Sequence, residues 1–214
     1  MGRWSQHITR QSVNELQAML ESRSLLRNGE EFELSSGVKS GFYFNAKPVT
    51  MDPRGAELVG SIVGPLVLDS GANAVGGLEL GAIWIATAVA NWCHEQDAPV
   101  ANVCVRDEHK SHGMKERITA SSGFMDLPVK RVAVVDDVIT TGKSTIRAVQ
   151  GLLADDCRIT SVITLVTRPE YGGVTEMAKT FAQYTDGPYI SIFDCDDEGT
   201  LAPRVNDFVG QPVS

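Results

Sequence analysis

The stretch VAVVDDVITTGKST, residues 132–145, decides the fold of this 214-residue chain. Its first four residues form a valine-rich apolar run, which is typical of a strand buried on both faces of a parallel sheet. Two adjacent aspartates, Asp136 and Asp137, follow directly, and a hydroxyl-rich segment with one glycine, 140–145, comes next. Neighbouring carboxylates repel each other, so the pair indicates a nearby ligand or ion that makes it useful.

Strand and helix patterns alternate on both sides of this stretch. Apolar runs predict further strands at 74–77, 100–105, 159–167 and 189–193. Helices are predicted at 82–95, at 174–184 and after residue 145, where Ile146, Val149, Leu152 and Leu153 form an apolar face. This alternation predicts an open, mostly parallel α/β sheet with helices on both faces. Ligands in such folds bind beyond the carboxyl ends of the strands, where the two aspartates are expected.

The first 50 residues follow a different pattern. Ser12 to Glu15 forms a capping box that predicts the start of a helix. A loosely alternating segment then predicts a hairpin around Ser36-Gly37, and Pro53 is expected in the first turn of the next helix. We therefore predict an N-terminal helix and hairpin hood, 1–50, and a core, 51–214.

The amino-acid composition and net charge argue against several classes of protein. With 43% hydrophobic and 21% charged residues, the chain suits a globular protein, and its net charge of −8 argues against a general nucleic-acid binder. No apolar run approaches the roughly 20 residues of a membrane helix, and the N-terminus lacks an apolar signal core. Scattered cysteines predict reduced thiols in a cytoplasmic protein, and neither cysteines nor histidines show metal-site spacing.

The segment 140–145 predicts a phosphate-binding loop. It immediately precedes a helix, whose free N–H groups and positive dipole end favour an anion, and Gly142 lets the backbone approach it closely. A Walker A loop is the obvious alternative, because GKST matches its ending. Asp137, however, stands where that motif requires its first glycine.

This combination resembles the 5-phosphoribosyl-1-pyrophosphate (PRPP) site of type I phosphoribosyltransferases, and DDVITTG resembles the orotate phosphoribosyltransferases over most of 30–195. The resemblance implies transfer of 5-phosphoribosyl from PRPP to orotate, which gives orotidine 5′-monophosphate and pyrophosphate. Asp136 and Asp137 would face the ribose hydroxyls, with Mg²⁺ held near them through PRPP and water and not by direct protein ligands. The PRPP-binding residues would be Val138, Ile139, Thr140, Thr141, Gly142, Lys143 and Ser144.

Two N-terminal and central segments extend the resemblance. The first is FELSSGVKSGFYFNAKPVT, 32–50, where the resemblance implies that Tyr43 and Phe44 lie along the orotate ring. Lys39 or Lys47 would supply positive charge to the anionic substrates, and we predict that Lys39 binds PRPP. The second is GGLELGAIWIATAVA, 76–90. The resemblance implies that its loop binds the pyrophosphate of PRPP at Leu80 and Gly81, mostly through backbone amides. Gly76 and Gly77 are expected to allow the same close approach, and Glu79 is expected to bond neighbouring backbone. Many family members carry a lysine where Gly81 stands.

The cationic segment VRDEHKSHGMKER, 105–117, resembles the family's mobile lid, which acts on the neighbouring subunit and so implies a homodimer. Arg106, Lys110 and His112 would take up pyrophosphate charge. Asp107 stands where the family typically has lysine, and His109 or Lys115 would have to compensate.

LVTRPEYGG, 165–173, implies that Arg168 binds the orotate carboxylate in a bidentate contact, with Thr140 also beside the base. Two alternatives stay open at this point. One is a phosphoribosyltransferase for another base. The other is a catalytically weak PRPP-binding regulatory paralogue, which Asp107 and Gly81 favour.

Overall fold

The computed structural model describes residues 2–27, 32–33, 39–107, 117–168, 170 and 172–204. A seven-stranded sheet forms its centre. The strands are β5 (Ala74–Leu78), β6 (Ala101–Val105), β7 (Ile118–Ala120), β8 (Arg131–Ile139), β9 (Arg158–Thr167), β10 (Tyr189–Cys195) and β11 (Leu201–Pro203). Their order is β11-β10-β9-β8-β5-β6-β7, and only the two edge pairs, β10 with β11 and β6 with β7, are antiparallel.

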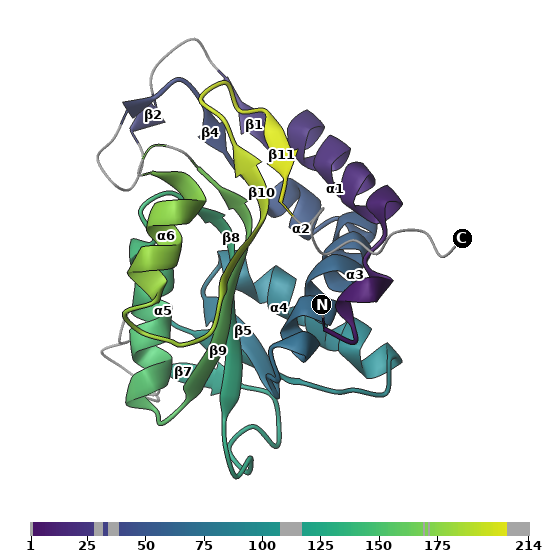
Figure 1. Ribbon diagram of the computed structural model, residues 1–214, viewed down its shortest axis with the longest axis vertical. Coiled ribbons are helices and arrows are strands. Elements are labelled where there is room, and N and C mark those ends of the chain that lie inside the picture. Colours follow the sequence, from purple (N-terminus) through teal and green to yellow (C-terminus); the bar gives the residue numbers. More distant parts are fainter. Residues whose placement is uncertain are drawn as a thin grey trace.

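Helices cover both faces of the sheet (Figure 1). The helices α3 (Pro53–Asp69) and α4 (Gly81–Glu95) pack on one face, and α5 (Lys143–Ala154) and α6 (Gly173–Phe181) pack on the other. Successive β8 residues alternate between the two cores, with Ala133 and Val135 in one and Val132 and Val134 in the other. The predicted open, mostly parallel α/β fold is confirmed. In the described part of the chain, no helix is long and apolar enough to span a membrane.

The N-terminal segment adds one long helix and several short elements. These are a 3₁₀ turn (Ser5–His7), α1 (Arg10–Arg23), β1 (Leu25–Leu26), β2 (Phe32–Glu33), β3 (Lys39–Ser40), β4 (Tyr43–Phe44) and α2 (Lys47–Thr50). Of these, α1, α2 and the 3₁₀ turn contact α3. β2 pairs with β3 and β1 with β4, both antiparallel. The pairing of β2 with β3 is that of a hairpin, although Ser36-Gly37 lie outside the described residues. Leu16 and Leu20 of α1 belong to the same hydrophobic core as α3 and α4.

Several local predictions need correction. α1 begins earlier than the capping box suggested, because Thr9 is its N-cap and accepts a hydrogen bond from the Ser12 N–H. Leu153 is exposed at 39%, so it does not belong to the buried face of α5. Pro53, by contrast, occupies the first turn of α3 as predicted.

β8 is longer than its apolar run. The strand continues through both aspartates to Ile139, because β9 keeps pairing with it as far as Thr167. Pairing with β5 ends at Val134, so the last part of β8 extends beyond β5. That extension leaves one side of the aspartate pair open to the loop between β5 and α4.

Candidate active site

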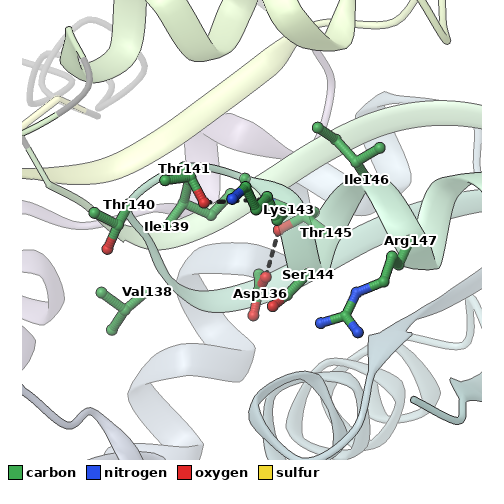
Figure 2. A pocket seen from close by; sticks show the side chains of 11 residues that line it. Asp136, Val138, Ile139, Thr140, Thr141, Lys143, Ser144, Thr145, Ile146 and Arg147 are labelled. Atoms are coloured by element: carbon green, nitrogen blue, oxygen red, sulfur yellow. Dashed lines mark hydrogen bonds between the residues drawn. The ribbon is translucent and has the colours of Figure 1, made fainter. Parts of the chain in front are cut away.

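Asp136 is a buried carboxylate at the start of the β8 extension. Its Oδ1 accepts a hydrogen bond from the Asp137 N–H at 3.0 Å, and its Oδ2 accepts one from the Thr145 hydroxyl (Figure 2). Burial, and then the neighbouring charge of Asp137, raise the pKa of Asp136 to about 7. The pair therefore joins a carboxyl that readily holds a proton to a neighbouring carboxylate.

The hydroxyl-rich loop leads directly from β8 into α5. Gly142 is the N-cap of α5 and has φ of +73°, a left-handed conformation that favours glycine. The first-turn N–H groups of a helix lack intrahelical partners, so they are available to an anion. The loop lines a cavity of about 490 Å³. Its lining consists of Asp136, Val138, Ile139, Thr140, Thr141, Gly142, Lys143, Ser144, Thr145, Ile146 and Arg147 (Figure 2).

A second cavity, of about 390 Å³, lies next to the first and shares Asp136, Val138, Thr140 and Ser144 with it. Segments far apart in the sequence line it together. The remaining lining residues are Tyr43, Phe44, Lys47, Leu78, Glu79, Leu80, Gly81, Asp107, Asp137 and Arg168. The structure thus brings part of the predicted set to one cleft at the carboxyl end of the sheet, namely Tyr43, Phe44, Leu80, Gly81, Asp136, Asp137, the loop 138–144 and Arg168.

Asp137 is held from two sides. Its Oδ1 accepts a hydrogen bond from the Val138 N–H at 2.9 Å, and its Oδ2 lies 3.3 Å from the Lys47 Nζ. A Cβ added at Gly81 would lie 2.4 Å from the same Oδ1. A larger residue at position 81 would therefore require the carboxylate or the backbone to shift. Gly76 and Gly77, in contrast, lie within β5, where a Cβ would meet the backbone oxygens of Val103 and Val135.

Arg168 is only 2% exposed and is already bonded on every guanidinium nitrogen. Its Nε and one terminal nitrogen donate to Glu170, and that terminal nitrogen also donates to the Ser40 hydroxyl at 2.7 Å. The other donates to the Phe42 carbonyl at 3.4 Å. The guanidinium also lies over the Phe42 ring, 4.2 Å from its centroid. Because a guanidinium has five N–H donors, a bidentate contact with a ligand would require some of these bonds to open.

The other predicted residues divide into three groups. Tyr43 is exposed and Phe44 is buried in the core, and both line the second cavity. Lys39 is exposed on β3 and Arg106 is half-buried after β6, and neither lines these two cavities. Lys110, His112, His109 and Lys115 lie outside the described residues.

Four site residues lie beyond the predicted set or its assigned roles. Lys47, which the sequence left as an alternative to Lys39, lines the cavity, and Thr145 binds Asp136. Glu170 pairs with Arg168, and Arg147 pairs with Asp107. The spacing of Thr145, one turn into a helix after the aspartates, is the signal that could have indicated its role. Glu79 behaves as predicted, since its carboxylate accepts from the Asp107 N–H at 3.3 Å.

The donor set suits a loosely held magnesium ion. Within the described ranges, no group of three or more His, Cys, Asp or Glu side chains could form a metal cage. Mg²⁺ usually keeps several waters and binds through one or two carboxylates together with substrate phosphates. Asp136 and Asp137, beside a phosphate-type loop, fit that mode of binding.

Known proteins resemble this chain in sequence and in fold. No family model matches it. The orotate phosphoribosyltransferase of Bradyrhizobium sp. strain BTAi1 is 40% identical over 152 residues, which cover 71% of this chain and 80% of that protein. A structure of Mycobacterium tuberculosis orotate phosphoribosyltransferase with Fe(III) dicitrate is 29% identical, with a TM-score of 0.67 over 86% of this chain and 96% of that chain. A structure of the same enzyme with PRPP is 27% identical, with a TM-score of 0.64 and the same coverage.

Proposed function

Because this chain belongs to the orotate phosphoribosyltransferase family, we propose that its cleft carries out the family's reaction with Mg²⁺ as cofactor. The chain is a transferase, and the reaction moves the 5-phosphoribosyl group of PRPP to orotate. The products are orotidine 5′-monophosphate and pyrophosphate. The M. tuberculosis relative, whose fold this chain shares, was solved with PRPP bound.

One observation carries the assignment of the site. The aspartate pair and the hydroxyl-rich loop line the same cleft as Tyr43, Lys47 and Arg168. The first group suits a ribose phosphate, and Tyr43 and Arg168 suit a planar anionic base. A sugar phosphate seated on the loop would therefore present its C1′ toward the second cavity.

The chemistry requires little more than placement and charge stabilisation. A ring nitrogen of orotate forms a bond to C1′ while the C1′–O bond to pyrophosphate breaks, and that oxygen keeps the electron pair. Asp136 and Asp137 accept hydrogen bonds from the ribose hydroxyls, and the N-terminus of α5 holds the 5-phosphate. When bound, Mg²⁺ supplies charge neutralisation on the leaving pyrophosphate, and the two aspartates would hold it through water.

The base would be held by Arg168 and Tyr43. Arg168 can offer the orotate carboxylate one contact while Glu170 remains bound, and two contacts if Glu170 partly releases it. Thr140 lines both cavities and so can contact the base and the phosphoribosyl group.

We further propose a homodimer in which Arg106, Lys110 and His112 act on the partner's site. Family resemblance supports this arrangement, and Lys110 and His112 lie outside the described residues. Sedimentation of the protein tests whether it forms a dimer. Action across the interface is tested by mixing two inactive variants, of which one carries a substitution at His112 and the other at Asp137. Recovered activity in the mixture supports action across the interface, and no recovery contradicts it.

The activity test uses purified protein with PRPP, Mg²⁺ and orotate. We expect orotate absorbance to fall, and chelation of Mg²⁺ with EDTA to stop the reaction until the metal is restored. Uracil, adenine and hypoxanthine in place of orotate test the base. PRPP binding without turnover of any base would favour the regulatory alternative and contradict the proposed function.

A further inference from the structure

We propose that Lys47 is a pyrophosphate-binding cation that each subunit supplies to its own site, and that it binds PRPP by exchanging Asp137 for the substrate. The inference rests on the proposed function and deepens it. It places the cation for the leaving group on α2, in the N-terminal segment, and not on the loop between β5 and α4.

The loop between β5 and α4 offers no cation of its own. Its side chains in the second cavity are Leu78, the acidic Glu79 and the exposed Leu80. A side chain at Gly81 would collide with Asp137, because its Cβ would lie 2.4 Å from the carboxylate. That carboxylate is itself buried and held by the Val138 N–H, so it cannot readily move aside. Positive charge at this point has to come from another element.

Lys47 reaches the same carboxylate from α2. Its Nζ lies 3.3 Å from Oδ2 of Asp137, while Gly81 faces Oδ1. Val49 and Thr50, which follow it in α2, are fully buried, so the base of the side chain is fixed. The side chain itself remains 36% exposed, and Lys47 lines the second cavity. A fixed base and a partly exposed ammonium suit a group that changes partners.

The other cations that line the two cavities lie at other points of the site and have no ion pair with Asp136 or Asp137 among the described residues. Arg168 is buried and bound to Glu170, Arg147 is paired with Asp107, and Lys143 lies in the first turn of α5 beside the phosphate loop. Among the described lining residues, Lys47 is the cation that contacts the aspartate pair. An anion leaving C1′ above that pair would meet its ammonium first.

The exchange is energetically reasonable. The exchange leaves neither charge without a partner, because the ammonium gains phosphate oxygens while the buried Asp137 carboxylate keeps its bond from the Val138 N–H. Charge-assisted bonds from an ammonium to phosphate oxygens are strong. Once released, Oδ2 of Asp137 becomes available to a ribose hydroxyl. Binding of pyrophosphate and of ribose would thus be coupled through one ion pair.

The test compares Lys47→Met and Lys47→Arg with the wild-type protein. We expect Lys47→Met to raise the KM for PRPP at least tenfold and to leave the KM for orotate within about twofold. Lys47→Arg should recover most of the affinity for PRPP that Lys47→Met loses. In titration calorimetry with Mg²⁺, Lys47→Met should weaken pyrophosphate binding at least tenfold but change ribose 5-phosphate binding less than threefold. A merely structural role would weaken both ligands together.

Lys179→Met is the matched control, because it removes one positive charge from the exposed face of α6, away from both cavities. It should leave unchanged the KM values for PRPP and orotate and the dissociation constants for pyrophosphate and ribose 5-phosphate. Equal losses for pyrophosphate and ribose 5-phosphate in Lys47→Met would overturn the inference, as would the same selective loss in Lys39→Met but not in Lys47→Met. An inactive wild-type protein would instead contradict the proposed function, while the pyrophosphate calorimetry would still test Lys47.

Discussion

Arg147, the fifth residue of α5, forms an ion pair with Asp107, which lies two residues after the end of β6. Asp107 occupies the position where the family resemblance leads one to expect a lysine. Arg147 lines the first cavity and Asp107 lines the second, so the pair connects the two. The acid at position 107 is therefore accompanied by a neighbouring cation on α5, and the local charge is balanced in the absence of substrate.

Asp107→Lys is expected to improve PRPP binding with little change in stability. The pair is 49% and 43% exposed, and exposed pairs of this kind contribute about 0–1 kcal/mol. The substitution frees Arg147 and adds a cation beside the cleft. We expect the KM for PRPP to fall about threefold to tenfold at low salt, and the gain to shrink as salt screens it.

Steady-state kinetics at two ionic strengths measure this effect. Asp107→Asn is the control, because it releases Arg147 without adding a cation, and it should produce a smaller gain. An unchanged KM at low salt would show that the charge at position 107 does not act on PRPP.

Asp136→Asn is expected to change how stability depends on pH. Burial and Asp137 raise the pKa of Asp136 from 3.8 to about 7 in the folded state. Between these values the folded protein binds more protons than the unfolded chain, so the free energy of unfolding falls as pH rises from about 4 to 7. Asparagine does not titrate. The variant should therefore lose this part of the slope and be more stable than wild type at pH 8, by at least about 1 kcal/mol.

Urea unfolding of both proteins at pH 5 and pH 8 provides the measurement. The variant should also lose activity by about 100-fold or more, since it removes a carboxylate that we propose to bind the ribose hydroxyls. Equal pH slopes for the two proteins would mean that Asp136 titrates in the folded state as it does in the unfolded chain.

The sequence could predict the elements whose structure depends on the local pattern of residues. The valine-rich run, the aspartates and the loop up to Ser144 are consecutive, so β8, the loop and α5 follow from residues within one short stretch. The edge strands β7 and β11 were missed because each has three residues and its burial pattern depends on a partner strand. The extension of β8 through two charged residues was missed because the pairing strand β9 determines it, and not β8's own composition.

The site was predicted less completely than the fold because partners distant in sequence define it. Arg168 was identified, but its bonds to Ser40 and the Phe42 carbonyl join residues more than 120 positions apart. The choice between Lys39 and Lys47 could not be made from spacing, since both lie within one short segment. Only the fold, which turns α2 toward β8, distinguishes them.

Gly81→Ala is expected to damage catalysis more than stability. The added Cβ would lie 2.4 Å from Oδ1 of Asp137, so the carboxylate or the start of α4 has to shift. Alanine is itself the better helix former, which offsets part of the strain. We expect kcat/KM to fall about tenfold to 100-fold, equivalent to about 1.4–2.7 kcal/mol, with a much smaller change in the free energy of unfolding.

Gly41→Ala is the matched control, because a Cβ there meets nothing within 4 Å. Kinetics and thermal unfolding of the two variants measured together separate the effects. A Gly81→Ala enzyme with normal kcat/KM would show that Asp137 does not need the position it has in this structure.

Glu170→Gln is expected to destabilise the protein, and orotate is expected to reverse part of the loss. Arg168 is buried, and removal of one partner from a buried ion pair costs about 3–5 kcal/mol because the other charge remains uncompensated. A ligand carboxylate can replace the missing one. Orotate should therefore raise the Tm of Glu170→Gln more than it raises the Tm of the wild-type protein.

Uracil provides the decisive comparison, since it has the same ring as orotate without the carboxylate. It should raise the Tm of the variant no more than that of wild type. Arg168→Met, which removes the buried cation, should abolish the difference between the two ligands. If orotate and uracil stabilise Glu170→Gln equally, Arg168 does not bind the carboxylate of orotate. Its guanidinium then serves only to hold Ser40 and Phe42 in place.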